Sequence, residues 1–173
     1  MNKKKQNEFL SLYKPVHERF ERFCRARVYG EMEYADLMNE TLMRAYEKFD
    51  TLKSKDAFLS FLFSISVRVL ANTNRKRNET TKLNHEAFIV SDHSNLADKN
   101  ADVHLLYLAL GKLPEDQKES IILFEITGFS IKEIAAIQKT SESNVKQRLR
   151  RGRLKLREVL SDIHSEKREG VTR

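Results

Sequence analysis

The chain has 173 residues and a formal net charge of +7, and 40% of its residues are hydrophobic. That length fits one ordinary domain or two small ones, and the 5 glycines and 2 prolines disfavour a fold rich in tight turns. The basic excess indicates a polyanionic partner and favours nucleic acid over a membrane surface. No run approaches the roughly 18 consecutive apolar residues of a membrane span, so we expect a soluble, unexported protein.

The single cysteine, Cys24, excludes a disulfide within the chain and is typical of a protein in a reducing cytoplasm. It lies in a run with Phe20 and Phe23, so we interpret it as a small core residue rather than a reactive thiol. We therefore expect a cytoplasmic protein.

The N-terminal half has the apolar spacing of helices. Pro15 should bend or split the first helix, and Gly30 should end it. The third helix should end in the basic run Arg75-Lys76-Arg77, and a short loop at 50–56 should precede it. The predicted helices lie at about residues 7–29, 34–49 and 57–76.

Helical spacing is lost after residue 77, where Asn, Asp, Ser, His and Thr become frequent, and this predicts a linker. The spacing resumes near Val103. Leu113-Pro114 should then separate two further helices, and Gly128 should end the second of them.

A short helix, a turn and a longer helix follow Gly128. Ser130 and Glu133 have the spacing of a capping box, in which each residue's side chain bonds the backbone N–H of the other. Residues 138–140 can form the turn, and Ser141 is a suitable N-cap for the longer helix. This order predicts a helix-turn-helix, whose apolar stripe is Val145, Leu149, Gly152 and Leu156.

The outer face of the longer helix should be polar and basic. Residues 139–157 contain eight basic residues and one acid, which accounts for the net charge of the whole chain. Asn and Gln can pair with adenine and Arg with guanine in the major groove, while further Lys and Arg suit phosphates. The outward residues are predicted to be Ser143, Asn144, Lys146, Gln147, Arg150 and Arg151.

These patterns predict an all-α fold of two small helical domains joined by a flexible linker, the second containing the helix-turn-helix. The expected division is 1–78, 79–102 and 103–173.

The sequence also resembles a known family. Residues 110–160 resemble the C-terminal lobe of extracytoplasmic-function (ECF) sigma factors of the sigma-70 family. Residues 36–49 are similar to that family's core-polymerase-binding helix, and residues 57–77 to its promoter −10 helix. The marks in the C-terminal half are Leu113-Pro114, Gly128-Phe129-Ser130, Glu133-Ile134-Ala135 and Val145-Lys146-x-Arg148-Leu149, followed by Arg151 and Leu156.

The resemblance implies a protein that directs core RNA polymerase to specific promoters and has no catalytic activity. It implies core RNA polymerase, promoter DNA and an anti-sigma factor as partners, without a cofactor, metal or small-molecule substrate. The helix from Glu142 would read the −35 element, and the loop at 50–56 would capture a flipped base. Core polymerase would contact Asp36, Asn39 and Glu40, and the −10 element would lie near Arg68, Asn72, Asn74, Arg75 and Arg77.

Some positions depart from the family pattern. Tyr46 and Phe61 stand where tryptophan is frequent, and both keep an aromatic ring for packing. Lys139 stands where the turn often has glycine, and because a left-handed backbone strains lysine we expect a different turn. Ser143-Asn144 replaces a usual Gly-Thr, and Val67-Arg68 replaces a frequent Arg-Asn pair. The family's promoter contacts are therefore not carried over in detail.

Two other functions remain open from the residues alone. A plain helix-turn-helix regulator that does not bind core polymerase would use the same motif, but it leaves the acidic strip at 36–40 unexplained. An enzyme acting on nucleic acid would need clustered acids or histidines for metal, whereas the five histidines are scattered and no phosphate-binding or zinc motif occurs in the sequence.

Overall fold

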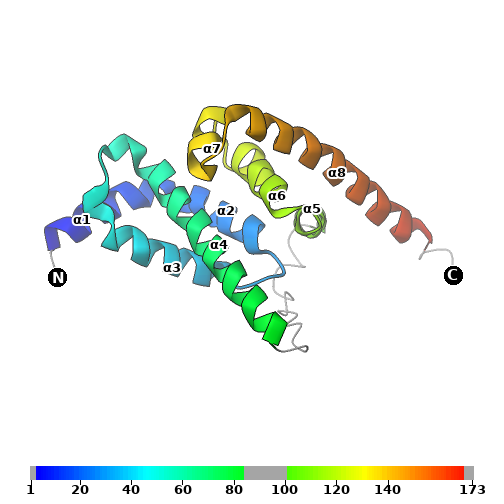
Figure 1. Ribbon diagram of the computed structural model, residues 1–173, viewed down its shortest axis with the longest axis horizontal. Helices are drawn as coiled ribbons and strands as arrows, with labels where there is room; N and C mark the ends of the chain where they lie inside the picture. Colours follow the sequence, from blue (N-terminus) through cyan, green and yellow to red (C-terminus); the bar gives the residue numbers. More distant parts are fainter. Residues whose placement is uncertain (1–2, 84–100, 170–173) are drawn as a thin grey trace.

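The computed structural model describes residues 3–83 and 101–169, and within them it contains helices and short connections but no strand (Figure 1). The predicted all-α fold is confirmed. The N-terminal half comprises α1 (Lys3–Tyr13), η1 (Lys14–Val16), α2 (His17–Val28), α3 (Tyr34–Glu47), η2 (Phe49–Thr51), η3 (Lys55–Ala57) and α4 (Phe58–Leu83). The C-terminal half comprises α5 (Ala101–Gly111), α6 (Glu115–Ile121), the π-helical turn η4 (Ile122–Ile126), α7 (Ile131–Gln138) and α8 (Glu142–Glu169).

Proline and glycine divide the helices where the sequence predicts. Pro15 lies in the short turn between α1 and α2, because proline lacks the N–H that a continuous helix requires. Gly30 and Gly128 follow helices with φ of 77° and 71°, a left-handed backbone that glycine adopts without strain.

One boundary differs from the prediction: α4 continues to Leu83, into the segment predicted as linker. Residues 77–83 contain neither glycine nor proline, so nothing in their sequence stops the helix. The rest of the predicted linker up to residue 100 lies outside the described residues.

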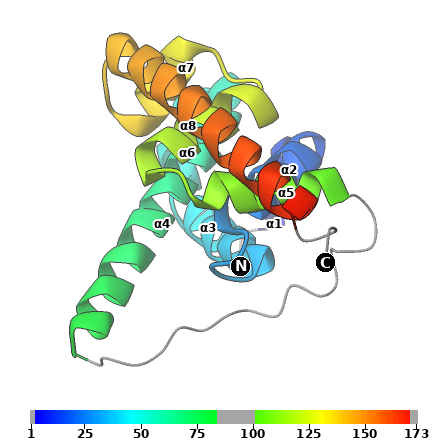
Figure 2. The same ribbon diagram turned by 90° about the vertical axis from the view of Figure 1, so that its right-hand side faces the viewer.

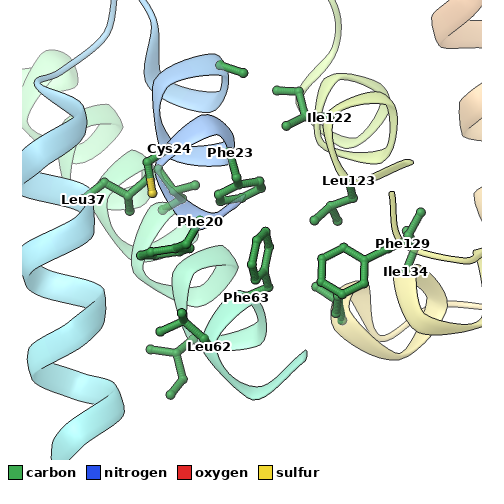
Figure 3. Packing of buried hydrophobic residues seen from close by; sticks show 14 of the residues in the cluster. Phe20, Phe23, Cys24, Leu37, Leu62, Phe63, Ile122, Leu123, Phe129 and Ile134 are labelled. Carbon is green, nitrogen blue, oxygen red and sulfur yellow. The ribbon is translucent and has the colours of Figure 1, made fainter. Parts of the chain in front are cut away.

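The core of the N-terminal half is aromatic. Phe20, Phe23 and Cys24 on α2 are fully buried, and Phe63 on α4 packs between them and the C-terminal half (Figure 3). Burial raises the pKa of the Cys24 thiol, so Cys24 is the core residue that the sequence predicts. Tyr46 packs edge-on against Phe9 at a centroid distance of 5.5 Å, which confirms an aromatic packing role at that position.

By length and composition, one stretch of the described residues, Lys55–Lys76, could cross a membrane. The fold accounts for its apolar character, because α4 contributes much of the core. Its buried residues include Phe58, Leu62, Phe63, Ile65, Val69 and Leu70.

The two halves pack directly against each other. α4 lies on α7, and α2 lies against η4 and α5, so the buried residues of both halves form one continuous core (Figures 1 and 2). The ring of Phe63 stands 4.8 Å from that of Phe23 within its own half and 4.8 Å from that of Phe129 in the other. The sequence predicted two lobes but not this shared core.

Candidate nucleic-acid interface

The predicted capping box begins α7. The Ser130 backbone N–H donates to Glu133 Oε2 at 2.8 Å, and the Glu133 backbone N–H donates to Ser130 Oγ at 3.3 Å. Hydrogen bonds from the side chain and backbone of Ser130 lower the pKa of the Glu133 carboxyl. The first helix of the motif therefore starts where the sequence places it.

The turn after α7 corrects one prediction. Lys139 has φ 52° and ψ 49°, so the chain keeps a left-handed turn with lysine in place of glycine. A left-handed conformation costs a non-glycine residue about 1–2 kcal/mol. The bond from the Thr140 N–H to the Ala135 carbonyl, at 2.9 Å, closes the helix end and offsets part of that strain.

Side chains of the turn also fix the start of α8. Ser141 Oγ accepts from the Asn144 backbone N–H at 3.1 Å, which confirms Ser141 as an N-cap. The Asn144 side-chain amide donates to Thr140 Oγ1 at 3.0 Å. Asn144 therefore supports the turn with its Nδ2, although the residue is exposed.

The inner face of α8 packs on α6 and α7. Val145 is fully buried and Leu149 is nearly so. Gly152 is buried so closely against α6 that a Cβ at this position would lie 3.0 Å from Ile121 Cγ1. Close packing at Gly152 thus sets the distance between α8 and the rest of the C-terminal half, and with it the position of the outer face.

The basic residues of α8 differ in their pairing. Arg148 Nε lies 3.1 Å from Asp116 Oδ2, and Arg153 Nη2 lies 2.7 Å from Glu125 Oε1, so these two arginines tie α8 to the helices beneath it. No hydrogen bond or ion pair among the described residues involves the other side chains on the outer face, Lys146, Gln147, Arg150 and Arg151.

The outer face has the form that a DNA major groove accepts. An α-helix fits that groove with its N-terminal residues nearest the base edges. Amide and guanidinium groups without partners in the protein can bond bases and phosphates at no cost in lost internal bonds. All of the predicted −35 residues are exposed: Ser143, Asn144, Lys146, Gln147, Arg150 and Arg151.

A second polar strip lies on α4. Arg68, Asn72 and Arg75 are exposed and follow one another at intervals of four and three residues, so they share a face of the helix. Asn74 is half-buried, and the helical rotation of 100° per residue turns it away from Arg75. The structure therefore brings three of the predicted −10 residues together and separates Asn74; the side chain of Arg77 lies outside the described residues.

The predicted polymerase-binding residues Asp36, Asn39 and Glu40 line a cavity of about 370 Å³ between α3 and α4. Glu40 Oε1 also accepts from Arg44 Nε at 2.5 Å. Two methionines join the same lining, and one of them, Met43, has 55% of its surface exposed. Neither Met32 nor Met43 is among the predicted polymerase-binding residues, although Met43 follows Asn39 and Glu40 at helical spacing.

Comparison with known proteins places this geometry in a family. Residues 12–80 match the model of sigma-70 region 2, and residues 104–156 match the model of sigma-70 region 4. The ECF RNA polymerase sigma factor EcfG of Rhodopseudomonas palustris (strain TIE-1) is 31% identical over 129 residues, which span 72% of this chain and 70% of the relative. The chain belongs to the ECF sigma factors. A second relative, the ECF sigma factor SigX of Bacillus subtilis (strain 168), is 28% identical over 93% of this sigma factor and 88% of its own length.

Solved structures agree with the fold. The sigma factor RpoE of Bartonella quintana, solved in complex with the anti-sigma factor NepR, has a TM-score of 0.80 at 28% identity, over 89% of this sigma factor and 97% of RpoE. CnrH, solved with the cytosolic domain of CnrY, has a TM-score of 0.69 at 23% identity, over 91% of this sigma factor and 90% of CnrH, and shares the fold. The match to RpoE therefore includes both halves of this sigma factor.

The matches to both regions disfavour the alternative of a plain helix-turn-helix regulator, which has no need of region 2. The individual DNA and polymerase contacts remain predictions.

Proposed function

We propose that this ECF sigma factor directs core RNA polymerase to specific promoters in the cytoplasm, without catalysis or a cofactor of its own. The single observation that carries the proposal is the exposed outer face of α8, which belongs to a capped helix-turn-helix and on which Lys146, Gln147, Arg150 and Arg151 have no partner among the described residues. Such a face binds DNA through base edges and phosphates.

The two halves would divide the promoter between them. Residues 103–173 would bind the −35 element through α8. Residues 1–78 would bind core polymerase through α3 and the −10 element through Arg68, Asn72 and Arg75 on α4, with residues 79–102 as the linker. Each half would bind weakly alone, and simultaneous binding on one polymerase raises the effective concentration of the second contact.

The cavity between α3 and α4 suits a basic helical partner. Asp36 and Glu40 supply negative charge, while Met32 and Met43 supply an adaptable apolar surface. Core polymerase is the proposed partner at this surface. An anti-sigma factor is a further proposed partner, because RpoE was solved in complex with the anti-sigma factor NepR.

Transcription in vitro with core polymerase on genomic DNA, with mapping of start sites, tests the assignment. A guanidinium or amide that reads a base contributes about 1–3 kcal/mol. Arg150→Ala or Gln147→Ala should therefore reduce initiation at a cognate promoter by roughly 5- to 150-fold. Arg153→Ala is the matched control on the same helix, because Arg153 is paired with Glu125, and it should change initiation less than about twofold. Equal effects of Arg150→Ala and Arg153→Ala would contradict the proposed DNA face.

Co-purification with core polymerase separates a sigma factor from a plain regulator. Asp36→Ala and Glu40→Ala should weaken association with core polymerase with little change in the thermal unfolding curve, since Asp36 is exposed and the half-buried Glu40 loses only an i,i+4 pair with Arg44, worth about 0.3–0.5 kcal/mol. Glu47→Ala, exposed at the end of the same helix, is the matched control. Wild-type chain that never co-purifies with core polymerase would overturn the proposal.

A further inference from the structure

A network of polar side chains joins α6, α7 and α8. Gln138, the last residue of α7, lies at the centre of this network. Its Nε2 donates to Glu119 Oε1 on α6 at 2.8 Å. Its Oε1 accepts from Ser120 Oγ on α6 at 3.0 Å and from Arg148 Nη1 on α8 at 3.1 Å. One amide group therefore bonds both of the helices that pack beside the end of α7.

The chemistry of the partners fixes the direction of each bond that Gln138 makes. A guanidinium only donates hydrogen bonds, so the amide oxygen of Gln138 must face Arg148. The amide nitrogen then donates to Glu119, whose ionised carboxylate only accepts. Glu119 is buried, with 8% of its surface exposed, and its Oε2 lies 3.8 Å from Arg27 Nε. Only a side chain that both donates and accepts can join Glu119 to Arg148.

Arg148 is held from two directions. Its Nε lies 3.1 Å from Asp116 Oδ2 at the start of α6, and its Nη1 donates to Gln138 at the end of α7. The buried Val145 and Leu149 hold α8 against the same helices by apolar contact, which has no preferred direction. Hydrogen bonds do have a preferred direction, so the two bonds of Arg148 fix the rotation of α8 about its own axis.

The rotation of α8 sets where its outer face points. Gln147 lies about 100° around the helix from Arg148, and Arg151 lies about 60° from it on the other side. The side-chain surface of a helix lies about 6 Å from its axis, so a rotation of about 15° moves the outer side chains by roughly 1.5 Å. Contacts to base edges need positions held to within about 0.5 Å, whereas the flexible stem of a lysine can still reach a phosphate.

We propose that Gln138 is a positioning residue for recognition of the −35 element. By bonding Glu119 and Arg148 at once, it fixes the rotation of α8 and so determines how strictly the outer face discriminates between base sequences. The proposal rests on the proposed function, because it requires α8 to enter the major groove. Without the network, discrimination between −35 sequences falls, while the binding that phosphate contacts supply persists.

Sequence discrimination by the complex with core polymerase tests this role. The probe is a promoter duplex located by start-site mapping, compared with the same duplex carrying a scrambled −35 element. The ratio of the two Kd values measures base recognition, and a lower fraction of folded protein does not change that ratio. Gln138→Glu sets a carboxylate against Glu119 and should lower the ratio about tenfold, within the roughly 5- to 150-fold that one base contact supplies.

The salt dependence of binding to the scrambled duplex separates positioning from a general structural role. It should be the same for Gln138→Glu and for the wild type, because the phosphate contacts persist. Loss of both the salt dependence and the discrimination would show that α8 no longer reaches the DNA, and would overturn the proposal.

Exchange of the two side chains tests the pairing itself. Adding Glu119→Gln to Gln138→Glu restores the hydrogen bond with its direction reversed, and the carboxylate at position 138 still accepts from Arg148. The double variant should recover the wild-type ratio to within about twofold. A double variant that stays as unselective as Gln138→Glu would contradict the proposed pairing. Glu158→Gln, at an exposed acid that pairs with Lys155 within α8, is the matched control and should leave the ratio unchanged.

Gln138→Met keeps the test informative if Gln138→Glu fails to fold. Methionine is as long as glutamine and fills the same space flexibly, but it cannot replace the amide's bonds, so this variant should fold and lower the ratio roughly fivefold. An unchanged ratio in Gln138→Met would refute the positioning role. Wild-type complex that binds both duplexes equally would instead refute the proposed recognition of the −35 element, whatever the variants do.

Discussion

Gly152→Ala should destabilise the protein, although alanine is the better helix former. A Cβ at this position would lie 3.0 Å from Ile121 Cγ1, 3.4 Å from Ile121 Cδ1 and 3.4 Å from Gln117 Cβ. Carbon atoms pack best at about 3.5–4.0 Å, so α8 or Ile121 must move by about 0.5 Å or more. Overpacking of this kind costs about 1–3 kcal/mol, against a gain of about 1 kcal/mol in helix propensity.

The expected net loss for Gly152→Ala is therefore about 1 kcal/mol, or a Tm lower by about 2–4 °C. Gly111→Ala is the matched control: Gly111 is also helical, but nothing lies within 4 Å of its added Cβ, so this variant should gain up to about 1 kcal/mol. Urea unfolding followed by circular dichroism measures both. If Gly152→Ala is as stable as Gly111→Ala, the argument that close packing at Gly152 positions α8 is refuted.

Three further substitutions test separate parts of the structure. Lys139→Gly should stabilise the protein by about 0.5–1 kcal/mol in urea unfolding, because glycine adopts the left-handed turn without strain; a loss of stability would contradict that strain. Glu133→Ala should cost about 1 kcal/mol at pH 7. The pKa of Glu133 is held below its ordinary value of 4.5, so its contribution is present above pH 4.5 and is lost as the pH falls through the lowered pKa. The difference in Tm from wild type should therefore shrink with acidification, and a constant difference would argue against the capping bonds. Phe129→Ala should cost about 3 kcal/mol and lengthen the interlobe distance in the free chain, because the Phe129 ring packs against Phe63; an unchanged distance would show that this contact does not hold the halves together.

The helix-turn-helix shows how far local sequence rules extend. The capping box at Ser130, the N-cap at Ser141 and the exposed face of α8 involve residues only a few positions apart, and the sequence predicted each correctly. The turn at Lys139 is the exception. The intrinsic backbone preference of lysine argued against a left-handed conformation, but the chain adopts it, and the closing bonds of the helix end offset part of the strain.

The sequence did not predict contacts between residues that are distant along the chain. One basic run contains four arginines, Arg148, Arg150, Arg151 and Arg153. Arg148 is paired with Asp116, and Arg153 with Glu125, whereas the other two arginines have no such partner among the described residues. Only the positions of the two acids in space decide this difference. In the same way, Met43 was recognisable as a residue of the α3 face, but its exposure beside a cavity depends on how α4 packs.

The sequence by itself determined the all-helical class, the helix limits at Pro15 and Gly128, and the polar-basic face of α8, because helical periodicity and capping act within one or two turns. Only the tertiary structure decided that the two halves share a core and that Arg27 and Lys118 bury their charges between them. Those residues lie more than 80 positions apart from their partners, and no local pattern encodes such a pairing.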